Sequence, residues 1–315
     1  NEQNTPMTGL ILDYKRDYQK PEFLEAVGGI VLKPRNLPLD IFGIDGEKSV
    51  PEMNAKAMNF INIISMVFGG IGGQQRDRLR EVIIQKISEL DHSPTMREIS
   101  EAYRLANKNK ADSVTEILNN FVYGEVFSSD PKTFENMEQL LADHVVVVDL
   151  RALDPDERTK KTLVAVFLSK YFEYMVKLPK WPVQPGQPQL RRLNSFLLVD
   201  EAVSIMEYHF DPLHQILLQG REYGVSVILS SQYLSHFISS EANYAQPLRT
   251  WFIHRVPTVS KKSLNELGIV AATIEDAARI ADLGIHHSFY ASFDCPGRFI
   301  EGNPFFRLLE QIDAS

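Results

Sequence analysis

Three apolar runs that each end in an aspartate constrain the fold of this sequence more than any other feature. The runs cover residues 10–13, 145–149 and 196–200, and they end in Asp13, Asp149 and Asp200. Continuous apolar runs are typical of strands covered on both faces, as in a parallel sheet between layers of helices. An aspartate after such a strand places a carboxylate at the sheet edge where parallel α/β proteins bind ligands.

Strand-like and helical segments alternate along most of the chain, which predicts βαβ units and a mostly parallel sheet. We expect strands at residues 9–13, 29–32, 145–149, 195–200, 225–231, 250–256 and 288–293. Between residues 51 and 143 the pattern is helical, with no convincing strand. The helices expected there cover residues 76–90, 96–106 and 113–122.

These patterns predict an α/β fold class, with a mostly parallel sheet covered by helices on both faces and an all-helical insertion. Residues 1–50 would form the first part of the core, residues 51–143 the insertion, and residues 144–315 the rest of the core. Residues 57–75 are long enough to span a membrane, but a polar stripe of Asn59, Asn62 and Ser65 favours a buried amphipathic helix. No membrane contact is therefore expected for this segment.

Charge and cysteine content narrow the classes of function. The formal net charge of −8 argues against a protein that coats nucleic acid with its whole surface, so any such contact must be local. Local candidates are the basic residues Arg76, Arg78, Arg80, Lys108 and Lys110, although charge runs are usually solvated helix faces. The single cysteine, Cys295, excludes a disulfide framework within the chain and suits a reducing compartment, so a cytoplasmic location is expected.

The third apolar run is the most informative, because Glu201 follows Asp200 directly. Nucleotide hydrolases need a carboxylate at a strand end to hold Mg²⁺ through water and a second carboxylate to polarise the attacking water. A helix after Asp211 and Pro212 leads through Arg221 to the next expected strand, which ends near Gln232. If the two strands are neighbours, Gln232 would approach the acidic pair, whereas Arg221 would lie at the far end of the helix.

The segment at residues 195–237, SFLLVDEAVSIMEYHFDPLHQILLQGREYGVSVILSSQYLSHF, resembles the Walker B to sensor region of the HerA and FtsK superfamily of P-loop motors. LILDYKRDY at residues 10–18 resembles the segment that follows the Walker A helix in that superfamily. VVVVDLRALDPDERTKKTLVAVFLSKY at residues 145–171 resembles its central strand and helix. Within the superfamily the sequence is most similar to HerA-like proteins of DNA metabolism and phage defence, including the DptH group linked to phosphorothioate modification.

The resemblance implies a RecA-like fold and ATP hydrolysis with Mg²⁺ between the subunits of a ring, with a hexamer expected, that moves along double-stranded DNA. Asp200 would orient Mg²⁺ through water, and Glu201 would be the general base. Gln232 would contact the γ-phosphate, Arg221 would act as an arginine finger in the neighbouring subunit, and Asp13 would contribute to hydrolysis.

One required motif is missing, because the sequence contains no G-x-x-x-x-G-K-[ST] phosphate loop. Residues 43–49 imitate it, but with a shorter glycine spacing and with Glu47 facing the phosphate, so we interpret them as a turn. In the superfamily the motif precedes the segment similar to residues 10–18, so here it would lie before Asn1. We therefore expect the chain to be the C-terminal piece of a longer polypeptide and to bind ATP weakly or not at all when alone.

Other functions remain open from the sequence. The chain could be a non-hydrolysing assembly platform for a partner nuclease or restriction enzyme, or a coupling ATPase of secretion or conjugation. Asp13, Tyr14 and Lys15 also match the D-x-K element of a restriction-type nuclease, although no upstream carboxylate completes that site. We interpret His209 and His214 as structural, Asp149 as a capping residue and Cys295 as a turn residue.

Overall fold

A computed structural model describes residues 7–44, 46, 48–186, 191–208, 210–238, 243–292 and 294–303 of the chain. Residues 1–6, 187–190, 239–242 and 304–315 lie outside these residues, as do His209, Phe293, and Asp45 and Glu47 of the imitation phosphate loop. The chain divides into two compact units, Asn1–Ser230 and Ser231–Ser315. Each unit is described by itself.

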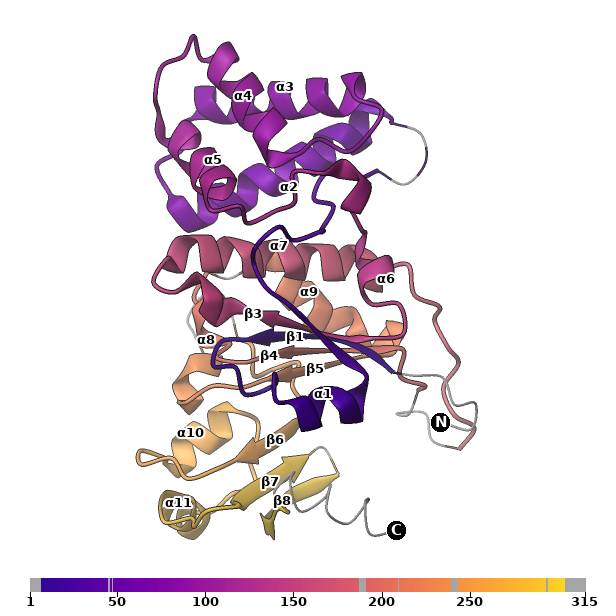
Figure 1. Cartoon of the computed structure of the whole chain (residues 1–315). Coiled ribbons are helices and arrows are strands. Elements are labelled where there is room, and N and C mark those ends of the chain that lie inside the picture. The colour runs from indigo at the N-terminus through magenta and orange to yellow at the C-terminus, as the bar shows by residue number, and fades with distance from the viewer. Residues whose placement is uncertain are drawn as a thin grey trace. The chain divides into compact units, whose positions relative to one another are not determined.

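The first unit is built on a five-stranded sheet in which every pairing is parallel (Figure 1). The order is β2-β3-β1-β4-β5. The strands are β1 (Thr8–Asp13), β2 (Gly29–Leu32), β3 (Val145–Asp149), β4 (Ser195–Val199) and β5 (Val225–Leu229). The α/β fold class is confirmed, and all five predicted strands of this sheet are present to within two residues at each end.

Helices cover both faces of this sheet (Figure 1). On one face, Ile11, Val145 and Val147 are buried against α1 (Pro21–Val27). The opposite face lies under the long helix α7 (Glu157–Met175), which is buried on nearly all sides because α2 and α9 also pack on it. A helix that is buried on most sides forms the centre of a core rather than its surface. The other helical segments after β3 are η2 (Leu150–Leu153), α8 (Val203–Met206), α9 (Asp211–Gln219) and η3 (Gly220–Tyr223).

The segment between β2 and β3 is helical, and its described residues contain no strand, as the periodicity of residues 51–143 predicts. Four helices pack together beyond α7 (Figure 1), and α2 contacts α7. They are α2 (Val50–Phe68), α3 (Gly73–Glu89), α4 (Met96–Ala106) and α5 (Ser113–Tyr123), followed by η1 (Pro131–Thr133) and α6 (Met137–Leu140). Capping boxes at Ser49 and Thr95 fix the first residues of α2 and α4. None of the described helices is long and apolar enough to cross a lipid bilayer.

The second unit contains a separate, antiparallel sheet in the order β6-β7-β8. Its elements are η4 (Leu234–Phe237), β6 (Thr250–Ile253), α10 (Lys261–Glu266), α11 (Ile274–Ala281), β7 (His287–Ser292) and β8 (Cys295–Glu301). The assignment of Cys295 to a turn is wrong, because β8 begins there. Pro296 and Gly297 concealed this strand in the sequence, since both residue types are rare within strands. Gly297 is needed there because a Cβ would come within 2.3 Å of the ring of Phe289.

Gly224, directly before β5, lies where both the backbone conformation and a close neighbour favour glycine. Its φ is 66°, and a Cβ would approach the carbonyl oxygen of Arg192 to 2.4 Å. Gly28 has a similar φ of 62° but no atom within 4 Å of a Cβ. We expect Gly28→Ala to lower the free energy of unfolding by about 1 kcal/mol and Gly224→Ala by about 3 kcal/mol, measured by urea denaturation. Equal losses of unfolding free energy in the two variants would contradict the close contact between Gly224 and the carbonyl oxygen of Arg192.

Candidate functional site

The three aspartates noted in the sequence lie at the carboxyl ends of three adjacent strands. β1 lies between β3 and β4, and Asp13 is in register with Asp149. Asp200 follows β4, and its amide donates to the carbonyl oxygen of Leu12 in β1 at 3.1 Å. The exposed fractions of Asp13, Asp149 and Asp200 are only 0%, 1% and 8%. Because buried carboxylates are costly without partners, their surroundings determine what each of them can do.

Asp13 is surrounded by donors from the turn that follows it. Its Oδ1 accepts the backbone amides of residues 15–17 at 2.8–3.3 Å. Its Oδ2 accepts the amide of Tyr18 at 3.3 Å and the side-chain amide of Gln19 at 3.2 Å. Both carboxylate oxygens are therefore engaged within the chain, and the side chain fixes the turn that presents residues 14–16.

Asp149 pairs with a basic residue of the same turn. The Nε of Arg16 lies 3.1 Å from both carboxylate oxygens of Asp149, and a second guanidinium nitrogen lies 3.0 Å from Oδ2. This pairing raises the pKa of Arg16 through the hydrogen bond to Asp149. The capping role predicted for Asp149 is wrong, because its side chain makes no capping hydrogen bond to η2.

Asp200 is held by Ser230, the residue that follows β5. The hydroxyl of Ser230 donates to Oδ1 of Asp200 at 2.5 Å and accepts the amide of Glu201 at 3.3 Å. The backbone of Ser230 donates to the carbonyl oxygen of Val199 at 3.1 Å and accepts the amide of Ala202 at 2.9 Å. One serine thus fixes both the acidic pair and the turn that contains it.

The second oxygen of Asp200 is available for a ligand. Oδ2 is buried and makes no hydrogen bond with any described residue. Such an oxygen suits Mg²⁺, which usually keeps several waters and binds proteins through one or two carboxylates. The described residues contain no group of three or more metal-ligating side chains, so they offer this single carboxylate rather than a complete metal cage.

Glu201 lies beside Asp200 in an unusual backbone conformation. Its φ is 46°, in the left-handed region that a residue with a Cβ rarely adopts. Such outliers cluster at functional sites, where the surrounding structure enforces them. Lys15 Nζ forms an ion pair with Oε1 of Glu201, and this contact raises the pKa of Lys15.

Two tyrosines of the β1 turn complete the surroundings of the acidic pair. The hydroxyl of Tyr14 accepts a hydrogen bond from Ser204 at 2.6 Å. Burial raises the pKa of Tyr14, with a further contribution from nearby carboxylates. Burial and the charges of Asp200 and Asp13 raise the pKa of Tyr18 to about 12. Both phenols therefore stay protonated near neutral pH and add no negative charge to this edge.

Two predicted site residues remain, Arg221 and Gln232. Arg221 is exposed in η3, directly before β5, and so it lies at the opposite sheet edge from Asp200. Gln232 belongs to the second unit. The predicted adjacency of the strands that carry Asp200 and Ser230 is confirmed.

Sequence reasoning missed the functional contacts of Ser230, Lys15 and Arg16. The signal available was modest, namely a serine at the end of the strand after the acidic pair and two basic residues after Asp13. Neither pattern identifies its partner, because Lys15 and Glu201 are far apart in sequence and meet only through the strand order.

No protein-family model matches the sequence, and no curated protein matches it. Solved structures do match. VirB4 of Thermoanaerobacter pseudethanolicus aligns with a TM-score of 0.69 at 13% identity, over 95% of this chain and 82% of its own. The bacterial conjugative coupling protein TrwB in its unbound form aligns with a TM-score of 0.57 at 14% identity, over 94% of this chain and 78% of its own. Plasmid coupling protein TrwB in complex with ADP and Mg²⁺ aligns with a TM-score of 0.56 at 13% identity, over the same shares.

The chain has the RecA-like fold. At these identities the likeness is one of fold. This likeness agrees with the parallel sheet and with the helices on both of its faces. A shared fold does not establish a shared chemistry, so the function has to be inferred from the residues of this chain.

The Arg16–Asp149 pair gives a prediction for this sheet edge. Arg16→Met should destabilise the protein because it leaves the carboxylate of Asp149 buried without its cation. Arg16→Met combined with Asp149→Asn should restore much of the lost stability, measured as the melting temperature. A double variant that is less stable than Arg16→Met alone would show that the carboxylate has another essential partner.

Proposed function

We propose that the chain is the motor core of a P-loop ATPase of the HerA/FtsK superfamily. The observation that carries this proposal is the acidic pair at the end of β4, in which Asp200 has a buried oxygen without a hydrogen-bond partner and Glu201 is held in a left-handed conformation. A carboxylate for Mg²⁺ next to a carboxylate for water is the arrangement that nucleotide hydrolysis needs.

Each residue of the sheet edge has a distinct part in this proposal. Asp200 would hold Mg²⁺ through water, and the ion would neutralise the charge of the phosphates. Glu201 would orient the attacking water and accept its proton. Asp13, predicted as a direct contributor to hydrolysis, instead fits a positioning role, since both its oxygens hold the turn that carries Lys15. Lys15 would restrain the carboxylate of Glu201.

The proposal also needs groups from outside these residues. The sequence has no phosphate loop, so the described site lacks the phosphate cradle that the proposal needs. Gln232 would contact the γ-phosphate, and Arg221 would reach the site of a neighbouring subunit in a homo-oligomeric ring, for which a hexamer is expected. The exposure of Arg221 at the opposite sheet edge is compatible with contact in trans.

Of the motors in this superfamily, a coupling ATPase is better supported than the DNA translocase or helicase expected from the sequence. The support is the shared fold with TrwB, a conjugative coupling protein whose structure holds ADP and Mg²⁺. Double-stranded DNA would be the partner of a translocase, and a coupling ATPase would move protein or single-stranded DNA. The findings add no support for the DptH group, phage defence or a nuclease partner.

Glu201→Gln tests the assignment of the general base. In the natural protein, we expect ATP hydrolysis to fall about 100-fold or more, while ATP binding is retained, because an amide cannot accept the proton. Glu207→Gln, at an exposed glutamate six residues away in the same region, should leave hydrolysis unchanged. Hydrolysis near the normal rate in Glu201→Gln would refute the assignment. Its absence in the unmodified polypeptide would favour the non-hydrolysing platform.

Lys15→Met tests the restraint on Glu201. A positive charge beside a carboxylate favours its ionised form, so its removal should shift the acidic limb of the pH–rate profile to higher pH. Lys15→Arg should preserve the profile, and Lys20→Met should leave it unchanged, since Lys20 is an exposed lysine near the same turn. An unshifted profile in Lys15→Met would show that the ion pair has no influence on the catalytic carboxylate.

A further inference from the structure

Tyr14 is the partly buried residue between Asp13 and Lys15 in the turn after β1. Its hydroxyl accepts a hydrogen bond of 2.6 Å from the hydroxyl of Ser204, which belongs to the four-residue helix α8. The two residues are 190 positions apart in the sequence, and they meet because β1 and β4 are neighbours in the sheet. This hydrogen bond therefore joins the turn after β1 to the turn after β4.

Ser204 closes the turn in which Glu201 lies. The backbone amide of Ser204 donates to the carbonyl oxygen of Glu201 at 3.1 Å. The amide of Met206 donates to the carbonyl oxygen of Ala202 at 3.0 Å, so the first turn of α8 begins directly after the acidic pair. A helix this short is not stabilised by its own backbone hydrogen bonds alone. Contacts such as that between Ser204 and Tyr14 therefore fix its position.

Tyr14 belongs to a closed set of contacts around Glu201. The carboxylate of Glu201 pairs with Lys15, the chain neighbour of Tyr14, and its carbonyl oxygen accepts from Ser204, the hydrogen-bond partner of Tyr14. Its amide donates to the hydroxyl of Ser230 at 3.3 Å. The carboxylate, the carbonyl group and the amide of Glu201 are thus all held. Enclosure of this kind is what keeps a residue with a Cβ in the left-handed conformation.

The helix α7 fixes Tyr14 from another direction. The ammonium group of Lys160 lies 5.9 Å from the centroid of the Tyr14 ring, within the range in which a cation is attracted to an aromatic face. Lys160 is itself buried, and it pairs with Asp154 and, at 2.7 Å, with Glu157. A buried ammonium group with two carboxylate partners has little freedom to move. The ring of Tyr14 therefore packs against a fixed neighbour.

We propose that Tyr14 is a positioning residue for Glu201 and that it acts through Ser204. The inference rests on the proposed function, because the carboxylate that Tyr14 would orient is the one that would activate water. Tyr14 does not itself fit a role in proton transfer. Burial raises the pKa of its phenol far above neutral pH, so the group stays protonated and cannot accept a proton.

Loss of the hydrogen bond between Tyr14 and Ser204 should slow the chemical step without weakening nucleotide binding. Without it, the turn at Glu201 would populate conformations in which the carboxylate is not aligned with the attacking water, and small misplacements of a catalytic group are costly. The oxygen of Asp200 that would face Mg²⁺ is not part of this set of contacts. The effect should therefore appear in kcat rather than in KM.

The test is the steady-state kinetics of ATP hydrolysis by the natural protein. Tyr14→Phe and Ser204→Ala should each lower kcat about tenfold and leave KM for ATP within about twofold. The two changes combined should be no slower than either alone, because both remove the same hydrogen bond. Ser204→Thr keeps the hydroxyl and should restore most of kcat. The control is Tyr123→Phe, at an exposed tyrosine of α5, which should leave kcat unchanged.

A second readout needs no nucleotide. The amide of Ser204 is bonded to the carbonyl oxygen of Glu201, so its hydrogen exchange in the whole chain reports on this turn. Tyr14→Phe should speed that exchange several-fold, and Tyr123→Phe should not change it. Circular dichroism establishes that each variant is folded. If Tyr14→Phe does not fold, Ser204→Ala tests the same hydrogen bond.

The outcomes separate this inference from the proposed function. A normal kcat in Tyr14→Phe and Ser204→Ala would overturn the positioning role, as would an equal loss of kcat in Tyr123→Phe. A raised KM with an unchanged kcat would also overturn it, in favour of a role in nucleotide binding. In each of these cases Glu201→Gln would still abolish hydrolysis, so the proposed function would stand. Absence of hydrolysis in the unmodified protein would overturn both.

Discussion

Buried negative charge at the carboxyl edge of the parallel sheet is the constraint on which the rest of the first unit depends. Three aspartates end adjacent strands there, and all three are buried, so their charges need partners within the protein. The turn after β1 supplies most of the donors and cations that pair with these carboxylates. Its backbone amides surround Asp13, its Arg16 pairs with Asp149, and its Lys15 pairs with Glu201. The turn therefore links all three strand ends.

The three aspartates differ in how many of their oxygens have donors within the chain, and this difference distinguishes Asp200 from the other two. Asp13 and Asp149 have both oxygens engaged by donors of the chain. Asp200 has one oxygen held by Ser230 and one that no described residue satisfies. A ligand cation therefore has one place at this edge where it meets an uncompensated carboxylate. The strained backbone of Glu201 keeps the second carboxylate next to it.

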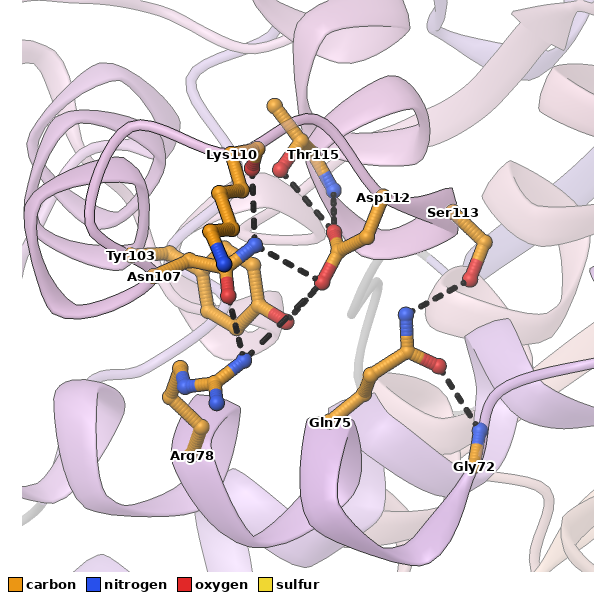
Figure 2. A network of polar contacts seen from close by, with 9 residues as sticks. All are labelled: Gly72, Gln75, Arg78, Tyr103, Asn107, Lys110, Asp112, Ser113 and Thr115. Carbon is orange, nitrogen blue, oxygen red and sulfur yellow. Dashed lines mark hydrogen bonds and ion pairs between the residues drawn. The ribbon is translucent and has the colours of Figure 1, made fainter.

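The helical segment between β2 and β3 also contains an aspartate with several hydrogen-bond partners, Asp112. Asp112 is a partly buried carboxylate, and there it receives four hydrogen bonds, so both its oxygens are engaged (Figure 2). Its effect is on the backbone, because it fixes the loop that carries Lys108 and Lys110. The same residue type thus keeps one oxygen without a described hydrogen-bond partner at Asp200 in the sheet and is a fully bonded anchor at Asp112 between helices.

The sequence by itself determined the five strands of the parallel sheet, the helical segment between β2 and β3, and the acidic pair, because these depend on local patterns. Continuous apolar runs located β1, β3 and β4, and the Asp200–Glu201 pair was visible without any structure. The strand β8 was hidden, since Pro296 and Gly297 are poor strand formers whose place is decided by packing against Phe289. Only the tertiary structure decided which carboxylates are satisfied and which basic residues remain exposed. Arg16 and Asp149, or Ser230 and Asp200, become partners because the strand order brings their ends together, and no local pattern records that order.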